Sequence, residues 1–326
     1  MSRLGEFHLI RRLLAPLTRN TPGAYNLTDD AATLAPSHGC ELVVTKDAVV
    51  AGVHFFATDP PDLIARKALR VNLSDLAAKG ARPVGFFMAL MLPDHIDDAW
   101  LSAFVGGLGH DIDEFGFPLM GGDTTATPGP LAISITAIGE VKAGHMTRRN
   151  GAMPDDVLCV SGTIGDAALG LEVAKGEHKN LSAAHQEFLL GRYRLPLPRM
   201  LLGQAEAARD SACIDISDGL CADVGHICTQ SNVGAIIEFD KVPLSMAVRA
   251  ALAQSSTVLM QVLTGGDDYE LAFAIPPANV PAALAHAQRV GVALTPIGRF
   301  VAGQGVSVLD ASGRPVKLPA TGYRHR

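Results

Sequence analysis

The sequence predicts a mixed α/β fold arranged as two domains. The chain has 326 residues, about twice the roughly 150 residues of a typical domain. Short Val- and Ile-rich segments typical of strands alternate with longer segments typical of helices. This alternation starts again at Val157–Val160, after a polar stretch at 148–154 that contains glycine and proline. We therefore expect an N-terminal α/β domain over residues 1–147 and a C-terminal α/β domain over residues 148–326.

The elements of the first domain can be placed from their residue types. Proline suits the first turn of a helix, so a helix is expected over Pro61–Lys79. A second helix is expected near Asp97–Phe115. Arginines separated by leucine and isoleucine near the N-terminus indicate an amphipathic opening helix rather than a transit peptide. Apolar segments rich in β-branched residues indicate strands over Leu42–Thr45, Ala48–Phe55, Phe86–Met91 and Leu131–Ile138.

Composition and charge exclude several classes of protein. The net charge is -6 and no long run of either sign occurs, which makes duplex nucleic acid an unsuitable partner. The longest apolar stretches, such as Phe86–Leu92, are far shorter than the roughly 18 to 20 residues that span a bilayer. Five cysteines form no C-x-x-C pair, which fits a reducing compartment. We expect a cytoplasmic protein that binds neither nucleic acid nor membrane.

Aspartates gather beside small and hydroxyl-bearing residues, where strands end or turns begin. Strand ends are where α/β folds build sites. If several of these carboxylates converge, each pair at about 4 Å repels by roughly 4 kcal/mol at an effective dielectric constant of 20, so cations must accompany them. Oxygen ligands without a cluster of Cys or His favour Mg²⁺, usually shared with substrate phosphates. The pattern therefore suggests phosphoryl transfer. The residues concerned are Asp29, Asp30, Asp47, Asp75, Asp123, Asp215, Asp218, Asp267 and Asp268.

Each aspartate taken alone is equally compatible with capping a helix or a turn, a reading that suits Asp29 and Asp218 best. Walker, protein-kinase and dinucleotide-binding motifs are absent from the sequence. Gly121 and Gly122, directly before Asp123, would let the backbone approach a polyphosphate, and the alternative is a bend at the end of a strand. The Gly162–Gly165 segment is interpreted as a plain turn.

Three further positions have both a functional and a structural reading. Asn72, Asp75 and Lys79 recur at helical spacing and would share one helix face. His54 lies beside two phenylalanines, where it would contact substrate or serve only packing. Arg148 lies at the domain junction, where a guanidinium would bind phosphate or remain solvated.

Taken together, these motifs resemble the thiamine-monophosphate kinases, in order and at compatible spacing from about residue 4 to Tyr323. Parts of the set are shared with the wider aminoimidazole-ribonucleotide synthetase superfamily. The motifs are Gly5-Glu-Phe7, Thr28-Asp-Asp-Ala-Ala32, Thr45–Asp47, Gly52-Val-His54, Val71–Ala78, Gly121-Gly-Asp-Thr-Thr125, Asp215-Ile-Ser-Asp-Gly219 and Gly265–Leu271.

The resemblance implies a two-domain α/β fold whose N-terminal sheet pairs with that of a second subunit in a homodimer. It implies ATP-dependent phosphorylation of thiamine monophosphate to thiamine diphosphate, by direct in-line transfer with several Mg²⁺ ions. By similarity, Asp47, Asp75 and Asp123 are the catalytic centre. Mg²⁺ ligands would be Asp30, Thr45, Lys46 (through its backbone), Asp47, Asp75, Asp123, Asp215 and Asp218. ATP contacts would be Gly121, Gly122, Asp123, Arg148 and Ser217, and substrate contacts His54, Asp267 and Tyr323.

The chain departs from the commoner family pattern at a few positions. Lys46 stands where Thr or Ser is usual, and Asp267 replaces Glu, which shortens the reach to substrate by one methylene. Ala320 stands where an aromatic residue is usual. Two other activities remain open alternatives: another ATP-dependent synthetase of the superfamily, and a multi-metal phosphohydrolase that uses water as acceptor. A nucleotide-sensing dimer without activity fits less well, because a relic would not need so complete a set of aspartates.

Overall fold

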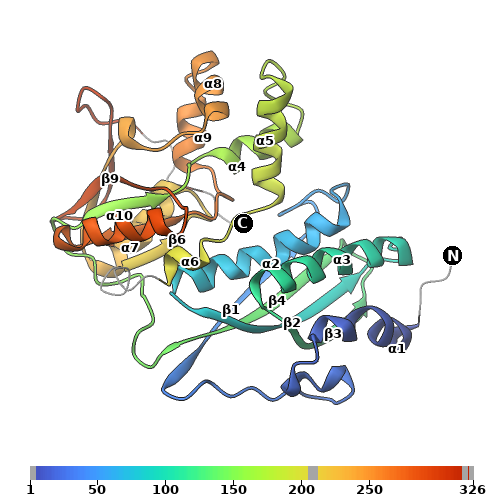
Figure 1. The fold of residues 1–326 in the computed structure, drawn as a ribbon. Coiled ribbons are helices and arrows are strands. Elements are labelled where there is room, and N and C mark those ends of the chain that lie inside the picture. The colour runs from blue at the N-terminus through green and yellow to red at the C-terminus, as the bar shows by residue number, and fades with distance from the viewer. Residues whose placement is uncertain (1–4, 205–211, 318–321, 323–326) are drawn as a thin grey trace. The chain divides into compact units, whose positions relative to one another are not determined.

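The computed structural model describes residues 5–204, 212–317 and 322 and shows two compact units. The N-terminal unit comprises Met1–Leu76 and Ala81–Gly144, and the C-terminal unit comprises Ala77–Gly80 and His145–Arg326. Each unit contains its own sheet and its own helices (Figure 1). The domain boundary after residue 147 stays a prediction.

The N-terminal unit is built on a four-stranded sheet with the strand order β1-β4-β2-β3. Strand β4 pairs antiparallel with both β1 and β2, whereas β2 and β3 are parallel. The strands are β1 (Cys40–Val50), β2 (Arg82–Leu92), β3 (Leu119–Ala126) and β4 (Ala132–Lys142), and the helices are α1 (Glu6–Leu9), α2 (Pro61–Ala78) and α3 (Asp98–Phe115). Helices α2 and α3 lie on the same face of this sheet (Figure 1).

Helices α2 and α3 form where the sequence predicts them. Pro61 begins α2, and the Asp97 side chain accepts a hydrogen bond from the backbone N–H of Trp100 and so caps α3. Gly116 ends α3 in a left-handed conformation. Fully buried leucines and a phenylalanine, Leu69, Leu73, Leu76, Phe104 and Leu108, form the core beneath them. The predicted helices are confirmed, and α2 ends one residue before Lys79.

Two other expectations for this unit are wrong in detail. The predicted strands over Leu42–Thr45 and Ala48–Phe55 are one strand, β1, followed by a turn over 52–54 that an isolated bridge between Ala51 and Phe55 closes. The chain leaves the sheet there because Gly52 has a positive φ and because the Nδ1 atom of His54 accepts the backbone N–H of Val50. The opening helix is α-helical only over Glu6–Leu9; a π-helical turn (Ile10–Leu14) and 3₁₀ turns (Ala15–Thr18 and Pro22–Leu27) follow.

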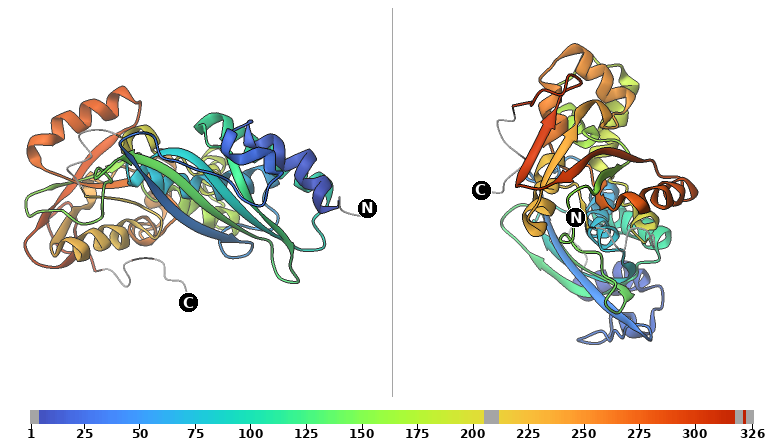
Figure 2. Two further views of the ribbon diagram at one scale, coloured as in Figure 1. Left: turned by 90° about the horizontal axis from the view of Figure 1, so that it is seen from below. Right: turned by 90° about the vertical axis from the view of Figure 1, so that its left-hand side faces the viewer.

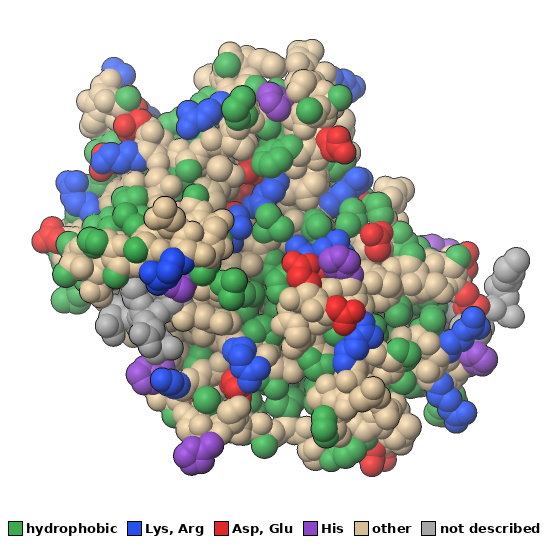
Figure 3. All heavy atoms as spheres, viewed as in Figure 1, with side chains coloured by type: hydrophobic (Ala, Val, Ile, Leu, Met, Phe, Trp, Pro, Cys, Tyr) green, Lys and Arg blue, Asp and Glu red, His purple; other side chains and the backbone are tan. Residues whose placement is uncertain are grey.

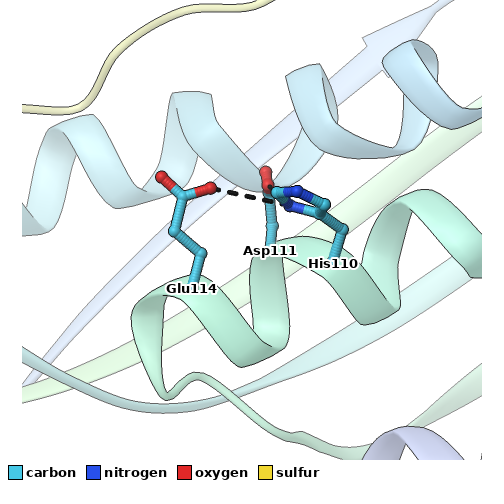
Figure 4. Close-up of side chains that lie close together, drawn as sticks. All are labelled: His110, Asp111 and Glu114. Atoms are coloured by element: carbon cyan, nitrogen blue, oxygen red, sulfur yellow. Dashed lines mark hydrogen bonds and ion pairs between the residues drawn. The ribbon is translucent and has the colours of Figure 1, made fainter.

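An ion-pair network joins α2 to α3. The buried Asp111 carboxylate accepts hydrogen bonds from Arg66 at 2.8 Å and from Arg70 at 2.6 Å, and Glu114 pairs with Arg70 at 2.7 Å. His110, Asp111 and Glu114 lie close together on α3 (Figure 4). Both Asp111 oxygens and one Glu114 oxygen already pair with guanidinium groups, so we interpret this cluster as an ion-pair link between the two helices rather than as a metal site.

The C-terminal unit is built on a six-stranded sheet with the order β10-β7-β9-β5-β8-β6. All neighbouring strands are antiparallel except β10 and β7. The strands are β5 (Val157–Ser161), β6 (Ala212–Asp215), β7 (Gly234–Glu238), β8 (Leu271–Ile275), β9 (Leu294–Val301) and β10 (Gly305–Leu309). The helices are α4 (Asp166–Ala174), α5 (Ala183–Arg194), α6 (Met200–Gly203), α7 (Leu220–Ser231), α8 (Met246–Gln254), α9 (Val258–Thr264) and α10 (Val280–Arg289).

The core of the C-terminal unit lies between this sheet and its helices. Helix α7 packs against β6, β7, β8 and β10, and α10 packs against β9 (Figure 2). Strand β8 is buried along its whole length, and Val224 and Ile227 of α7 are fully buried beside it. Because β6 ends at Asp215 and α7 begins at Leu220, the packing of these two elements fixes the ends of the loop between them.

The charge distribution on the surface and the lengths of the helices agree with the modest net charge and the short apolar stretches of the sequence. On the face drawn in Figure 3, basic and acidic side chains are interspersed rather than separated by sign. Within the described ranges, every helix is too short or too polar to cross a lipid bilayer.

Candidate active site

In the N-terminal unit, β1 and α2 bring two of the predicted catalytic aspartates together. The Thr45 hydroxyl on β1 donates a hydrogen bond to the Asp75 carboxylate on α2. One turn earlier on α2, the Asn72 side-chain oxygen accepts the backbone N–H of Asp47 at 3.1 Å, and its amide group donates to the Ala68 carbonyl oxygen at 3.0 Å. Asn72 and Asp75 therefore both contact β1 from one face of the helix, as their spacing predicts.

The electrostatics of this pair bear on cation binding. Burial, and secondly the negative charge of Asp75, raise the pKa of Asp47 to about 6. Asp47 therefore holds its proton more firmly than an exposed aspartate does. A cation placed beside Asp47 and Asp75 would reverse the balance by favouring the ionised form of both.

A cavity of about 340 Å³ lies in the same unit. Its polar wall contains Asp29, Asp30 and the Gly121–Thr124 segment of β3, while its apolar wall includes Leu27 and Met88. Asp30, Gly121, Gly122 and Asp123, which come from two distant parts of the sequence, thus share one cavity. The cavity thus combines a polar wall of backbone and carboxylate groups with an apolar wall. This combination is expected where a ligand has both a charged and an apolar part.

Gly122 is required by close packing between β3 and β2. A Cβ atom added there would lie 1.9 Å from the Met88 carbonyl oxygen. No side chain can be accommodated at that distance unless β3 moves away from β2.

The strand register separates these two groups of residues across the sheet. Asp47 pairs with Ile135, Ile135 with Met88, and Met88 with Gly122, so Asp47 and Gly122 occupy one row. They lie on the outermost strands, β1 and β3. Three strand intervals put their backbones about 14 Å apart. Within one N-terminal unit, the β1–α2 aspartates and the Gly121–Asp123 segment form two separate groups.

Two predicted residues have intermediate or exposed positions near β1. The Nδ1 atom of His54 is used within its own turn, where it accepts the Val50 N–H at 3.0 Å. This bond orients the imidazole ring and fixes which nitrogen acts as acceptor. Lys46 is exposed on β1 between Thr45 and Asp47, and its backbone pairs with Thr136 of β4 in the ladder register.

In the C-terminal unit, two loops carry the remaining described site residues. The DISDG loop is Asp215–Gly219, and the GGDDYE loop is Gly265–Glu270. Three backbone hydrogen bonds join the two loops: Asp267 N–H to the Ser217 carbonyl oxygen (2.9 Å), Tyr269 N–H to that of Ile216 (2.8 Å), and Ile216 N–H to that of Glu270 (2.7 Å). Ser217 and Asp267, predicted to contact different reactants, are therefore held side by side.

The GGDDYE loop has an unusual backbone. Both Asp267 (φ 71°) and Tyr269 (φ 51°) adopt positive φ values. Such a conformation costs a residue other than glycine about 1–2 kcal/mol and is found disproportionately at functional sites. Tyr269 belongs to the Gly265–Leu271 motif, but nothing in the residue pattern indicates its positive φ.

Two buried carboxylates support these loops: Asp223, which the residue pattern did not single out, and Asp268, which it grouped with the candidate site aspartates. Asp223 of α7 accepts the backbone N–H groups of Ser217, Asp218 and Gly219. Burial, and secondly the charge of Asp215, raise the pKa of Asp223 to about 8, against the lowering effect of the N–H bonds. Asp268 accepts the N–H groups of Gly165 (2.6 Å) and Ala167 (3.0 Å).

The Asp268 contact decides the reading of the Gly162–Gly165 segment. The Gly165 amide and the Ala167 amide in α4 already bind the Asp268 carboxylate, which agrees with a plain turn. Nearby, the fully buried Glu270 accepts ion pairs from Arg192 (2.9 Å) and Arg199. These groups form a polar core beneath the GGDDYE loop.

The remaining predicted residues are Arg148 and Tyr323. Arg148 is exposed, and its carbonyl oxygen accepts the N–H of Cys213 in β6, two residues before Asp215. Tyr323, like Ala320, lies outside the described residues.

The donor chemistry fits Mg²⁺. Thr45, Asp47 and Asp75 offer hydroxyl and carboxylate oxygens within one contact group, where burial and the charge of Asp75 raise the pKa of Asp47. Oxygen donors of this type, together with phosphate oxygens, are what Mg²⁺ coordinates.

Comparison with known proteins places the chain in a family. Residues 28–141 match the family "AIR synthase related protein, N-terminal domain" and residues 153–311 match "AIR synthase related protein, C-terminal domain". The thiamine-monophosphate kinase of Caulobacter vibrioides is 44% identical over 323 residues, which cover 98% of this chain and 90% of that protein. The chain belongs to the thiamine-monophosphate kinase family.

Solved structures of thiamine-monophosphate kinases share the fold. That from Stenotrophomonas maltophilia K279a is 40% identical with a TM-score of 0.85, covering 96% of this chain and 98% of the other. A structure described as AaThiL complexed with AMPPCP and TMP is 29% identical with a TM-score of 0.77, covering 100% of this chain and 99% of the other. The expected fold, a mixed α/β chain with two AIR synthase-type domains, is confirmed. Thiamine-monophosphate kinases are phosphotransferases, as the resemblance implied.

Proposed function

We propose that this protein transfers the γ-phosphoryl group of ATP to thiamine monophosphate, giving thiamine diphosphate and ADP. The observation that carries the proposal is the 44% identity to a thiamine-monophosphate kinase over nearly the whole chain. The solved structure of a relative complexed with AMPPCP and TMP supports the choice of both reactants. The β1–α2 aspartates and the residues around the cavity supply the chemistry that such a transfer needs.

The acceptor explains why no strong general base is needed. A phosphate monoester has a second pKa near 6 and a charge of about -1.5 to -2 at neutral pH, so it is already a nucleophile. The obstacle is repulsion between this anion and the triphosphate. Transfer therefore depends on positioning and on charge neutralisation rather than on proton removal.

We assign the Mg²⁺ ions to the oxygen donors of both units. The proposed ligands are Asp30, Thr45, the backbone of Lys46, Asp47, Asp75, Asp123, Asp215 and Asp218. Mg²⁺, when bound, neutralises the phosphates of both reactants and fixes their oxygens in line. Thr45 and Asn72 orient Asp75 and the Asp47 backbone so that the carboxylates are in place before a cation arrives.

We assign the nucleotide to Gly121, Gly122, Asp123, Arg148 and Ser217. The absence of side chains at the two glycines lets phosphate oxygens approach backbone N–H groups, and Arg148 adds a guanidinium. His54, Asp267 and Tyr323 are assigned to thiamine monophosphate. The hydrogen bond from the Val50 N–H to His54 Nδ1 would hold the imidazole ring ready for that contact.

We further propose that the protein is a homodimer whose N-terminal sheets pair. The register supports this proposal, because one N-terminal unit keeps Asp47 and Gly122 about 14 Å apart on opposite edges of its sheet. A twofold-related copy would supply the second group from the partner. A cytoplasmic location, expected from the cysteine pattern, stays a prediction.

The test is to incubate the pure protein with ATP, Mg²⁺ and thiamine monophosphate and to identify the products. Thiamine diphosphate and ADP in equal amounts support the proposal. Free phosphate without thiamine diphosphate would indicate the phosphohydrolase alternative instead. Thiamine and an aminoimidazole precursor serve as control acceptors, and turnover of the latter would point to a superfamily synthetase.

A further inference from the structure

Asp223 makes an unusual concentration of backbone contacts. A single carboxylate oxygen accepts the N–H groups of Ser217 at 3.1 Å, Asp218 at 2.9 Å and Gly219 at 3.0 Å. Asp223 is only 2% exposed and lies in the first turns of α7, so it reaches back over the loop that precedes its own helix. Consecutive residues of the DISDG loop are thereby pinned to one atom.

Helix capping alone would explain one such contact. A side chain near the start of a helix often accepts or donates one hydrogen bond at the helix entrance. Here the contacts extend beyond the helix to Ser217 and Asp218, the residues proposed to touch ATP and Mg²⁺. The other side of the DISDG loop is tied through its carbonyl groups to the GGDDYE loop. Asp223 therefore supplies the restraint on the N–H side of Ser217.

We infer that Asp223 is a positioning residue for the phosphoryl transfer: by gathering these N–H groups it sets the direction of the Asp215–Asp218 side chains toward the reactants. The inference rests on the proposed function for the identity of those reactants. Asp223 itself need not touch substrate or metal. A carboxylate that orients ligand-bearing backbone changes the metal affinity of the ligands without binding the ion.

The same geometry leaves a second reading to be tested. Asp218, Asp223 and His226 offer donor atoms within 4.8 Å of one another, so Asp223 would alternatively be a direct cation ligand. The two readings differ in what the Asp223 side chain must supply. A ligand needs the negative charge, whereas a backbone anchor needs only an oxygen acceptor of the same length and position.

Substitution by asparagine separates these demands. Asp223→Asn keeps an oxygen in place for the N–H groups, and the adjacent Asp215 and Asp218 carboxylates can receive its amide N–H groups. Asp223→Ala removes the acceptor altogether. Asp156 supplies the matched control: it is also a buried aspartate of the C-terminal unit, and its carboxylate accepts the Met153 N–H at 2.8 Å, in a turn that carries no proposed site residue.

The experiment measures steady-state kinetics, the Mg²⁺ concentration at half-maximal rate, and amide hydrogen exchange. We expect Asp223→Ala to lower kcat about 100-fold and to raise the Mg²⁺ midpoint about 10- to 100-fold. Exchange at Ser217, Asp218 and Gly219 should accelerate at least about tenfold while the amides of β8 stay protected. Asp223→Asn should remain within about threefold of the wild type in every readout. Asp156→Ala and Asp156→Asn should leave the Mg²⁺ midpoint unchanged.

Three outcomes would overturn the inference. One is an Asp223→Asn protein as impaired as Asp223→Ala, which would mean that the charge itself acts. Another is an unchanged Mg²⁺ midpoint in Asp223→Ala, and the third is an equal shift in the Asp156 variants, which would indicate general destabilisation. If the wild type fails to phosphorylate thiamine monophosphate, the proposed function fails; amide exchange and Mg²⁺ titration by calorimetry then still decide whether Asp223 orders the loop.

Discussion

At the scale of single residues, the pairing of Asp47 with Asp75 is the feature from which the chemistry follows. Two carboxylates lie in one contact group with Thr45 and Asn72, and one of them has a raised pKa. Among the described residues, no guanidinium pairs with Asp47 or Asp75 in the way that Arg66 and Arg70 pair with Asp111 in the α2–α3 network. A carboxylate pair left in this condition is well suited to accept a divalent cation.

Removing one charge from this pair should abolish most of the activity. We expect Asp47→Asn and Asp75→Asn each to lower kcat by at least about 100-fold, because the cation that offsets phosphate repulsion loses a ligand. Circular dichroism and melting temperature should change little. The exposed Asp94→Asn serves as a control with unchanged kinetics. Two active variants would refute the role of this pair.

The pKa of Asp47 predicts a pH dependence with a definite sign. Because the folded-state pKa is raised from 3.8 to about 6, the stability contributed by its protonated form is lost as pH rises from about 4 to about 6. Mg²⁺ must displace that proton, so without nucleotide its affinity should fall about tenfold per pH unit below pH 6.

Titration calorimetry at pH 5, 6, 7 and 8 measures this effect. The affinity of the wild type should level off above pH 7, while Asp47→Asn should bind more weakly at every pH and lose most of the slope. A wild-type affinity that does not vary between pH 5 and 7 would contradict the assignment.

At the scale of elements, β3 depends on its close approach to β2 at Gly122. We expect Gly122→Ala to push the strands apart, lowering stability by about 1–3 kcal/mol and raising KM for ATP more than KM for thiamine monophosphate. Gly106→Ala on α3 is the control, since a Cβ atom there meets nothing within 4 Å. It should stabilise the protein by about 0.5–1 kcal/mol. Thermal unfolding and steady-state kinetics report both effects, and a Gly122→Ala protein with normal parameters would argue against the packing constraint.

Elements with strong local signals were predictable, and those set by distant partners were not. Pro61 placed the start of α2, and the helix expected near Asp97–Phe115 is α3, which matches almost to the residue. The end of β1 at Val50 depends on the positive φ of Gly52 and on the hydrogen bond that His54 accepts, and the surrounding apolar, strand-like residues hide both signals. The same holds for the site: motifs identified Asp47 and Asp75, but the supporting roles of Asp223 and Asp268 arise only from hydrogen bonds that the fold creates.

At the scale of the whole molecule, the separation of β1 and β3 residues makes a prediction about assembly. If the dimer completes each site with residues from both subunits, then Asp47→Asn and Asp123→Asn proteins, each inactive, should complement each other when mixed. With free subunit exchange half of the dimers are mixed, and each mixed dimer has one intact site, so about a quarter of the wild-type activity should return.

The assay needs dissociation and reassociation of the two proteins before activity is measured. Mixing Asp47→Asn with Asp75→Asn is the control, because both substitutions lie in the same β1–α2 group and no intact site can form. Activity in the control mixture, or none in the test mixture despite proven exchange, would show that each chain builds its site alone.

The backbone bonds between the DISDG and GGDDYE loops have a consequence for how this sequence can change over evolutionary time. Since a backbone hydrogen bond joins Asp267 to Ser217, a substitution in one loop alters the background against which any substitution in the other is selected. The loop that carries Asp267 is therefore best regarded as one half of a coadapted pair of loops. The effect on activity of a single residue transplanted from a relative should depend on the residues of the other loop. Exchanging both loops together should leave the activity almost unchanged.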